Sequence, residues 1–422
     1  MHPRNVVMLC TITWLIIPTN ALTWQALDAQ LPKAPPPTII DAVHHRSSPP
    51  PLPDDTIVLY RERNGWCPYS ERVWLALECK NLPFATVLID NTGGGRPSWF
   101  GSTTPRLRWP DGSDMGESMD IVRAIDDRYG GGPRLYGPPD AQKLVAAFRD
   151  CFPRQTRPSS RAAFLFRSSG APVFRAAFEE TLEKTDALLE ERGGPFFAGA
   201  DLSAADVAWA PFLERYAAQL PLLHDGLRPR DASKYPSLAR WYDALEERVP
   251  AYCCRVRGDA ASWAKVLDQA GFGNSGGVPE LLSSGSAFDD EIATRGAAIW
   301  DDYAATRDYV ASTPAREAAA AVVRNRDALV ADAARFGVDD AGAACWPSPR
   351  RSTRARRSAT TPRGGASRPT STTALRAAGH GRAGRRGDPR APRLNMWCPR
   401  HGASFAVAKS FSADLDGPHS VK

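Results

Sequence analysis

The sequence predicts an α/β domain followed by an all-helical domain. Three observations support this fold class. Short segments rich in β-branched and aromatic residues occur between about residues 54 and 137, and they alternate with helical patterns. From residue 138 to about residue 273, apolar residues recur at helical spacing instead. A cysteine, Cys67, stands between the first β segment and the first helical segment. A chain of 422 residues has room for two or three such domains.

The α/β domain is expected to begin with a strand at Thr56–Tyr60. After a loop, Cys67 opens a helix that runs to about Lys80, and Pro68 suits the first helical position because its missing N–H would be unpaired there in any case. A second strand is predicted at Phe84–Asp90. These elements form a βαβ unit.

A hairpin and a helix are predicted to complete this domain. Thr104-Pro105 precedes a third strand at Arg106–Trp109, and the turn residues at 110–112 should return the chain as a fourth strand at Asp114–Gly116. Ser118–Tyr129 has the apolar spacing of a helix. The order βαβ followed by ββα is that of a thioredoxin-like domain with a mixed four-stranded sheet, here over residues 54–137.

The second domain, residues 138–273, contains only helical patterns. One or two helices are predicted within Asp140–Phe166, and further helices begin near Pro172, Ser203 and Tyr235. The helix near Pro172 has a stripe at helical spacing that consists of Phe174, Phe178, Leu182, Thr185 and Leu189. Ser203 and Asp206 have the spacing of a capping box. Residues 274–345 are interpreted as a helical extension, with a helical pair at 286–336 that is split near Pro314.

The two ends of the chain differ from this body in composition. Residues 1–21 combine a basic start with a short apolar run, as a targeting signal does, and the alternatives are an uncleaved anchor or a misassigned start. The Pro-rich residues 22–53 are interpreted as a linker or transit segment. We expect a plastid or secretory address, or the cytosol if the start is misassigned, and no stable membrane span.

The last segment, residues 346–422, carries 16 Lys or Arg against three Asp, so the rest of the chain is mildly acidic. Its few apolar residues predict a disordered basic tail, and a translation error or a nucleic-acid-binding tail are the alternatives. The acidic body gives no electrostatic reason to expect nucleic acid as a partner.

Cys67 is the strongest candidate for chemistry among the eight cysteines. The cysteines are too sparse for a disulfide scaffold and lack zinc-type spacing, so no metal is expected. A thiol at a helix N-terminus meets unpaired N–H groups and the positive end of the helix dipole, which predicts a lowered pKa. Ser70 stands where a dithiol motif has its second cysteine, so an external thiol must resolve a mixed disulfide, and glutathione is the abundant candidate. The alternative is that Cys67 is a small buried apolar residue.

The motifs Cys67-Pro68-Tyr69-Ser70, Thr104-Pro105 and Glu117-Ser118 resemble the glutathione-binding domain of glutathione transferases. The similarity is greatest to the cysteine-type lambda, omega and dehydroascorbate reductase classes, and the first motif also resembles monothiol glutaredoxins. The resemblance covers residues 54–273. It implies the two-domain fold predicted above, with an all-helical glutathione-transferase domain packed on the thioredoxin-like domain.

The resemblance also implies a glutathione site. The backbone of Thr104, before a cis-proline at Pro105, would hold the cysteinyl part of glutathione, and Glu117 and Ser118 would hold its γ-glutamyl end. An ordinary trans proline and a simple N-cap at Ser118 are the alternatives. Thr103 stands where several related classes have a lysine for the glycyl carboxylate, which predicts weaker binding. Tyr69 and Trp209 are candidates for the substrate cleft between the domains.

The predicted function is a glutathione-dependent thiol transferase or reductase that acts through a Cys67 thiolate. Its partners would be glutathione and a small-molecule or protein-disulfide substrate such as dehydroascorbate, with the chain a monomer or homodimer. A non-catalytic small-molecule carrier on the same fold and a scaffold protein that uses residues 286–336 and the basic tail are the competing hypotheses. Adjacent Cys253 and Cys254 are expected to have packing roles.

Overall fold

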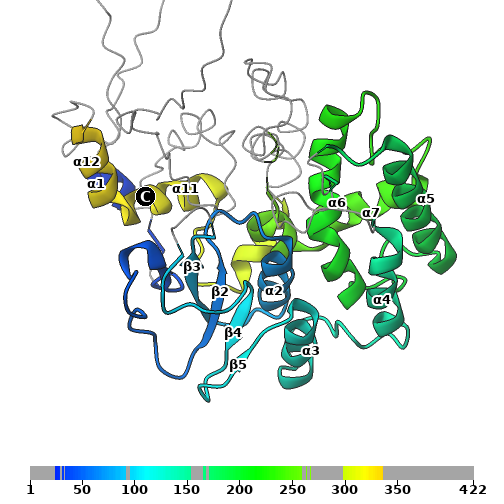
Figure 1. Cartoon of the computed structure of the whole chain (residues 1–422). Coiled ribbons are helices and arrows are strands. Elements are labelled where there is room, and N and C mark those ends of the chain that lie inside the picture. Colours follow the sequence, from blue (N-terminus) through cyan, green and yellow to red (C-terminus); the bar gives the residue numbers. More distant parts are fainter. Residues whose placement is uncertain are drawn as a thin grey trace, which may run out of the picture.

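The computed structural model consists of a mixed β-sheet covered by helices and packed against a helical domain (Figure 1). It describes residues 24–28, 31–32, 34–91, 96–153, 165–167, 171–258, 263, 267 and 298–335. The predicted targeting segment at 1–21 and the predicted disordered tail at 346–422 lie outside the described residues. Within the described residues, no helix is both long and apolar enough to cross a membrane.

The sheet contains five strands in the order β1-β3-β2-β4-β5. These are β1 (Ile39–Asp41), β2 (Ile57–Glu62), β3 (Phe84–Ile89), β4 (Arg106–Arg108) and β5 (Asp114–Met115). Strands β1, β3 and β2 are parallel, and β4 and β5 add an antiparallel hairpin to β2. The predicted βαβ-ββα order is therefore confirmed.

The expectation of four strands is wrong, because the Pro-rich segment contributes the edge strand β1. Ile39 pairs with Thr86 of β3, and the N–H of Thr86 also donates to the carbonyl of Thr38 at 2.8 Å. The short helical turn η1 (Ala42–His44) follows β1, with Ala42 fully buried. Three residues are too few for an alternating pattern to stand out in a sequence, so this strand escaped the sequence analysis.

The sheet buries both of its faces, as the alternation of side chains along β2 shows. Ile57 and Leu59 belong to a core shared with α2 (Pro68–Cys79) and α3 (Ser118–Arg128). Val58 and Tyr60 point to the opposite face, where Ala42 and Phe100 cover them. The N-terminal segment is held on this second face by the indole of Trp99, which donates to the carbonyl of His45 at 2.5 Å.

The helical domain contains α4 (Ala141–Cys151), α5 (Arg175–Arg192), α6 (Ala204–Leu223) and α7 (Pro236–Arg248). Its central helix is α6, which contacts α2 of the sheet domain and α4. The predicted capping box at its start is confirmed: Ser203 caps the first turn, and the Asp206 carboxylate accepts from the backbone N–H of Ser203 at 2.8 Å.

The stripe predicted for α5 is correct for four of its five members. Phe178, Leu182, Thr185 and Leu189 are completely buried, whereas Phe174 precedes the helix as its N-cap and is 65% exposed. The extended backbone of an N-cap residue turns its side chain away from the helical stripe, so the spacing argument failed at that end.

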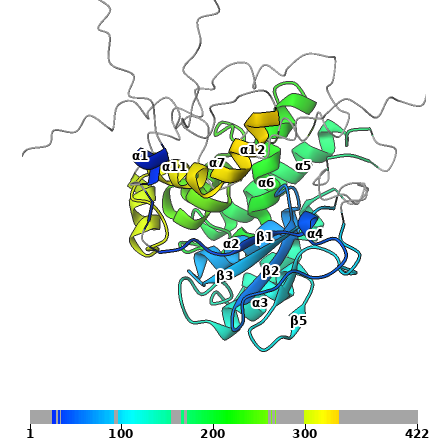
Figure 2. The ribbon, with the colours of Figure 1, turned by 90° about the vertical axis from the view of Figure 1, so that its left-hand side faces the viewer.

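A helical extension packs against the C-terminal end of α2, where the hydroxyl of Tyr303 donates to Glu78 at 3.0 Å. It comprises a helix at 298–305, α11 (Pro314–Arg324) and α12 (Arg326–Arg335), so a new helix does begin at Pro314, but the predicted pair consists of three helices. The N-terminal helix α1 (Trp24–Asp28) lies beside α11 (Figure 2), where Trp24 and Leu27 pack on Ala319. The two ends of the described chain therefore meet.

A short π-helical turn, η2 (Tyr252–Val256), links α7 to this extension. Cys253 and Cys254 lie in it as free thiols. Cys254 packs with Trp300 and Tyr303 of the extension, and its thiol donates to the carbonyl of Ile299 at 3.7 Å. The expected packing role of the cysteine pair is therefore seen for Cys254.

Candidate functional site

Cys67 occupies the N-cap of α2, at the end of the loop that follows β2. The carboxylate of Glu62, the last residue of β2, shapes this loop by accepting from the backbone N–H groups of Asn64 at 2.9 Å and Trp66 at 2.6 Å. No side chain caps the first turn of α2, since the Cys67 side chain makes no capping hydrogen bond. The sequence therefore places the thiol at an uncapped helix N-terminus, as predicted.

The helical domain holds the same loop from the other side. Arg215 of α6 is completely buried and pairs with Glu71 of α2 at 2.7 Å. The same nitrogen lies 3.4 Å from the carbonyl oxygens of Gly65 and Trp66. Because α6 is a rigid, buried helix, this arginine fixes the position of Cys67 relative to the second domain.

The Thr104–Pro105 bond is cis, which confirms the prediction for Pro105. The thiol of Cys67 faces this segment and donates to the carbonyl oxygen of Thr104 at 3.6 Å. The hydroxyl of Thr104 is held by the side-chain amide of Asn91 at 2.9 Å. Two motifs that are 37 residues apart in the sequence thus meet at one point.

Glu117 and Ser118 lie at the start of α3, and the two residues differ in exposure. Glu117 is the exposed N-cap and has a φ of 57°, a left-handed conformation that costs on the order of 1–3 kcal/mol for a non-glycine residue. Ser118 is 8% exposed. Such strain is typical of ligand sites, so the backbone at Glu117 is consistent with a binding role.

Arg72 connects these motifs, and the sequence analysis did not select it as a site residue. Its guanidinium Nη1 donates to Ser118 Oγ at 3.4 Å, and its Nε donates to the carbonyl of Ala208 in α6 at 2.9 Å. The side chain is 5% exposed. The available signal was a charged residue that precedes the apolar residues 73–77 of a helix, five residues after the candidate nucleophile.

The pKa of Cys67 contradicts the prediction made from its helix position. Burial raises the pKa of the Cys67 thiol above its ordinary value, and the nearby Glu62 carboxylate adds to the rise. The polar groups of Ser70 and Thr104 lower the pKa, but the loss of hydration has the larger effect. The prediction considered the helix terminus and neglected that Cys67 is only 3% exposed.

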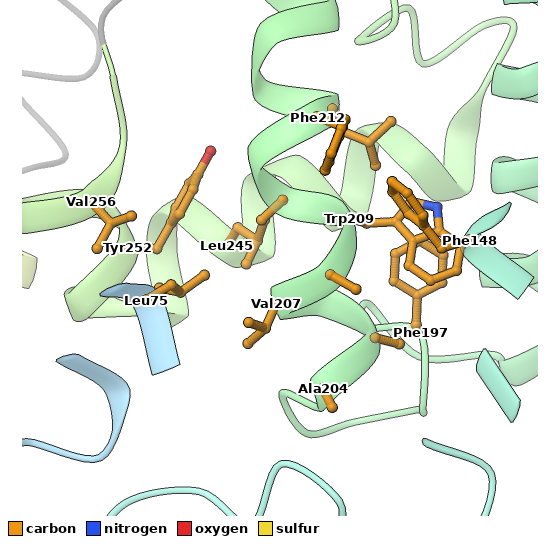
Figure 3. Close-up of a cluster of buried hydrophobic side chains, with 14 of the residues drawn as sticks. Leu75, Phe148, Phe197, Ala204, Val207, Trp209, Phe212, Leu245, Tyr252 and Val256 are labelled. Carbon is orange, nitrogen blue, oxygen red and sulfur yellow. The ribbon is translucent and has the colours of Figure 1, made fainter. Parts of the chain in front are cut away.

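Tyr69 and Trp209, the two candidates for the substrate cleft, occupy different environments. Tyr69 is half-buried, and its ring meets the edge of Phe212 with a centroid distance of 5.5 Å. Trp209 is completely buried between Phe148 and Phe197 (Figure 3). The expectation that Trp209 faces the cleft is therefore wrong, because a tryptophan at core spacing on the central helix packs inward.

The cations near Thr103 have partners of their own. Arg106 forms an ion pair with Asp114 at 2.9 Å, and Arg96 donates to the carbonyl of Phe100 at 3.2 Å. Neither contact places a cation at Thr103, where related classes have a lysine. In the described part of the chain, no cluster of three or more His, Cys, Asp or Glu side chains could hold a metal ion.

The fold and the site define a class of protein: a thioredoxin-like domain with a cysteine at a helix start and a cis-proline opposite, joined to a helical domain. Comparison with known families agrees with this class. Residues 66–128 match the family model "Glutathione S-transferase, N-terminal domain", and residues 159–244 match "Glutathione S-transferase, C-terminal domain".

Two similar plant proteins extend this match. The chain is 30% identical to "Glutathione S-transferase DHAR2" of Arabidopsis thaliana over 164 residues, which is 38% of this chain and 70% of the relative. It is 29% identical to "Glutathione S-transferase L3" of the same plant over 206 residues, which is 48% of this chain and 83% of the relative. The chain belongs to the glutathione S-transferase family, whose members bind glutathione as co-substrate.

A solved structure is also similar, over half of the chain. It is the "Crystal structure of Chlamydomonas reinhardtii dehydroascorbate reductase", at 23% identity and a TM-score of 0.38, and the match covers 52% of this chain and all of the other. The two family models end at residues 128 and 244, so the helical extension at 298–335 lies beyond both.

Proposed function

We propose that this protein is a glutathione-dependent thiol transferase or reductase in which Cys67 is the nucleophile. The observation that carries the proposal is the position of the Cys67 thiol, at an uncapped helix N-terminus and 3.6 Å from the carbonyl of Thr104, the residue before the cis-proline. The uncapped N–H groups of the first turn of α2 favour an anion at this point. Family membership supplies the co-substrate, glutathione.

The reaction would proceed in two exchanges. The Cys67 thiolate attacks the glutathionyl sulfur of a mixed disulfide; a bond forms between Cys67 and glutathione, and the substrate leaves as a thiolate that takes up a proton. The thiolate of a second glutathione then attacks the glutathionyl sulfur on Cys67. Glutathione disulfide leaves, and the Cys67 thiolate is restored. In net terms the substrate leaves as a free thiol and one glutathione thiol is consumed, because the other half of the glutathione disulfide is the glutathionyl group that the substrate carried. Dehydroascorbate is the alternative electron acceptor.

Each neighbouring group would have one task in this scheme. The backbone carbonyl of Thr104 accepts from the cysteinyl N–H of glutathione, and Ser118 and Glu117 receive the γ-glutamyl end, where a carboxylate and an ammonium group need opposite partners. The polar groups of Ser70, three residues after Cys67, lower the pKa of the thiol and would so favour its thiolate form. Tyr69 lies beside the thiol on the first turn of α2 and would border the second substrate.

A non-catalytic carrier is the second candidate, and one observation favours it. Because burial raises the pKa of Cys67, the thiol is mainly protonated at neutral pH in the free protein. A protonated thiol is a poor nucleophile. A protein of this kind would bind glutathione or a small aromatic molecule without turning it over.

The test compares the full-length chain with Cys67→Ser and with Cys79→Ser, which alters the thiol at the opposite end of α2. The readouts are the glutathione-dependent reduction of a glutathionylated peptide and of dehydroascorbate. We expect turnover in the parent and in Cys79→Ser, and a loss of about a thousandfold or more in Cys67→Ser. Glutathione binding without turnover in the parent would contradict the proposal and establish the carrier. Equal turnover in Cys67→Ser would exclude Cys67 as the nucleophile.

A further inference from the structure

We propose that Arg72 is a positioning residue of the glutathione site: it orients the Ser118 hydroxyl toward the γ-glutamyl carboxylate and supplies the buried positive charge opposite that carboxylate. This inference rests on the proposed function, because it concerns the ligand of the same site. Neither the motif comparison nor the family models assign Arg72 a role.

The hydrogen bond between Arg72 and Ser118 fixes the direction of the Ser118 hydroxyl. Arg72 Nη1 lies 3.4 Å from Ser118 Oγ. A guanidinium has only donors, so the hydroxyl oxygen must accept in this contact. The hydroxyl proton of Ser118 is then directed away from Arg72 and is available to a group that only accepts. A carboxylate is such a group.

The guanidinium of Arg72 carries a buried positive charge that no ion pair of the described residues matches. Arg72 is 5% exposed, and none of the ion pairs of the described residues includes it. Its Nη2 has no hydrogen-bond partner in the described part of the chain. Burial lowers the pKa of Arg72 to about 10, so the group remains charged at neutral pH. A buried donor without a partner is costly, and an arriving anion would relieve that cost.

Aromatic rings and a backbone carbonyl hold the side chain of Arg72 in place. Its guanidinium lies over the rings of Phe148 at 4.4 Å, Phe212 at 5.0 Å and Tyr69 at 5.3 Å from each centroid. Its Nε is tied to the carbonyl of Ala208. These contacts leave the guanidinium little freedom, so Nη1 keeps its direction toward Ser118 at the start of α3.

The charges around Arg72 agree with an anionic ligand. The ionisable groups that act on its pKa are Tyr69, Cys67 and Tyr136, with Arg149 of α4 as a second cation. Two arginines and a helix start thus lie near Glu117, whose charge acts on the neighbouring Tyr69, and Asp120 on the first turn of α3 is a second exposed acid. A ligand end that carries one carboxylate and one ammonium group matches this arrangement, with the carboxylate toward Arg72 and Ser118 and the ammonium toward Glu117.

The experiment measures the dissociation constants of two ligands by calorimetry. One ligand is glutathione. The other is 4-aminobutyryl-cysteinyl-glycine, which lacks only the γ-glutamyl carboxylate. The proteins are the full-length parent chain, Arg72→Lys, Arg72→Gln and Arg307→Lys. Arg307 is a matched control, because it is a buried arginine at the opposite end of α2, where it donates to the carbonyl of Glu78 at 2.8 Å.

We expect Arg72→Gln to weaken glutathione binding by about tenfold to a hundredfold, the range for a hydrogen bond to a charged group, and Arg72→Lys to weaken it less. The same substitutions should leave the affinity for the analogue unchanged within about twofold, and Arg307→Lys should leave both affinities unchanged. In turnover assays the loss should appear in KM for glutathione and not in kcat.

Equal weakening for both ligands would show a purely structural role and overturn the inference. So would an Arg72→Gln variant with parental affinity. If the Arg72 variants fail to fold, the inference is tested on the parent alone. The parent should bind the analogue at least tenfold more weakly than glutathione, and a smaller difference would overturn the inference. Glutathione binding that depends on Arg72 without any turnover would remove the proposed reaction and keep the inference, whereas a parent that does not bind glutathione would end both.

Discussion

The two ends of α2 are built on opposite principles. At the N-terminal end, Cys67 makes no capping bond and Arg72 keeps one buried donor without a partner in the described structure. At the C-terminal end, the Glu78 carboxylate accepts from the indole of Trp74 at 3.2 Å and from the hydroxyl of Tyr303 at 3.0 Å. One end has groups left over for a ligand, whereas the carboxylate at the other end is matched by groups of the protein itself.

The C-terminal end also joins segments that are distant in the sequence. Arg255 of η2 lies 3.8 Å from Glu78 and 3.9 Å from Glu317 of α11, and Arg307 donates to the backbone carbonyl of Glu78. Gly132, with a φ of 63°, lets the chain after α3 pass close to the carbonyl of Cys79, a space that a Cβ would fill. The contrast teaches that the same helix serves binding at one end and the attachment of the extension at the other.

Removing the charge of Glu78 should have the largest effect on stability. Glu78→Gln removes the acid that pairs with Arg307 and leaves Arg255 with Glu317 alone, and breaking a buried ion network in this way costs about 3 kcal/mol. The free energy of unfolding from denaturant titration measures this cost. Glutathione affinity of the folded protein should stay within about twofold, because the change is at the structural end of α2.

The control for this variant is Glu190→Gln, an exposed carboxylate on α5 whose loss should change stability by less than about 0.5 kcal/mol. If Glu78→Gln were no more destabilising than Glu190→Gln, the network at the C-terminal end would contribute nothing. If it weakened glutathione binding as much as Arg72→Gln, the two ends would not be separate in function.

The two thiols at the ends of α2 sharpen the comparison through their pH dependence. A raised pKa means that the thiol loses its proton only at higher pH, so the thiolate fraction of Cys67 should grow about tenfold per pH unit from pH 6 to pH 8, about 1.4 kcal/mol per unit. Burial raises the pKa of Cys79 to about 12, so most of Cys79 should stay protonated over this range, although its side chain is more exposed than that of Cys67. Iodoacetamide labelling followed by peptide mass spectrometry gives both rates.

Cys253 is the internal reference for this measurement, because the neighbouring Cys254 thiol and Arg257 lower its pKa. Its labelling rate should level off at a lower pH than that of Cys67. A Cys67 rate that is constant between pH 6 and pH 8 would mean that the thiolate already exists at neutral pH, and would reverse the direction given by burial.

The smallest expected effect is on the free energy of unfolding, for substitutions at the N-caps of α6 and α2. Ser203→Ala removes the hydroxyl that accepts from the N–H of Ala205 at 3.3 Å and should lower the free energy of unfolding by about 1 kcal/mol. Cys67→Ser, in contrast, gives α2 a residue type that favours the N-cap position, so stability should not fall. Thermal unfolding of the two variants beside the parent measures this difference. Equal destabilisation by both substitutions would show that the start of α2 needs its cysteine for packing.

The features that the sequence predicted correctly depend on local chemistry. The turn at 110–112 predicts a hairpin, Pro68 predicts a helix start, and Ser203 with Asp206 predicts a capping box; each pattern lies within a few residues. The cis bond at Pro105 came from a family resemblance and is present. Such features need no knowledge of how distant segments pack.

The features that the sequence could not predict depend on three-dimensional packing. Arg72 and Ser118 are 46 residues apart, and the residues adjacent to each in the sequence do not predict that they are in contact. The pKa of Cys67 follows from how deeply the sulfur is buried, which a helix-start pattern does not contain. Trp209 has the same helical spacing whether it faces a cleft or the core, and only the surrounding Phe148 and Phe197 decide for the core.

The contact between α1 and α11 has a consequence for synthesis on the ribosome. Trp24 and Leu27 find their partner Ala319 only after about 290 further residues have been translated. At a typical 5–20 residues per second this takes about 15–60 s, whereas β3, the partner of β1, follows within about 50 residues. The edge strand can therefore form early in synthesis, while the helix that precedes it waits almost to the end of the described chain before its apolar side is covered.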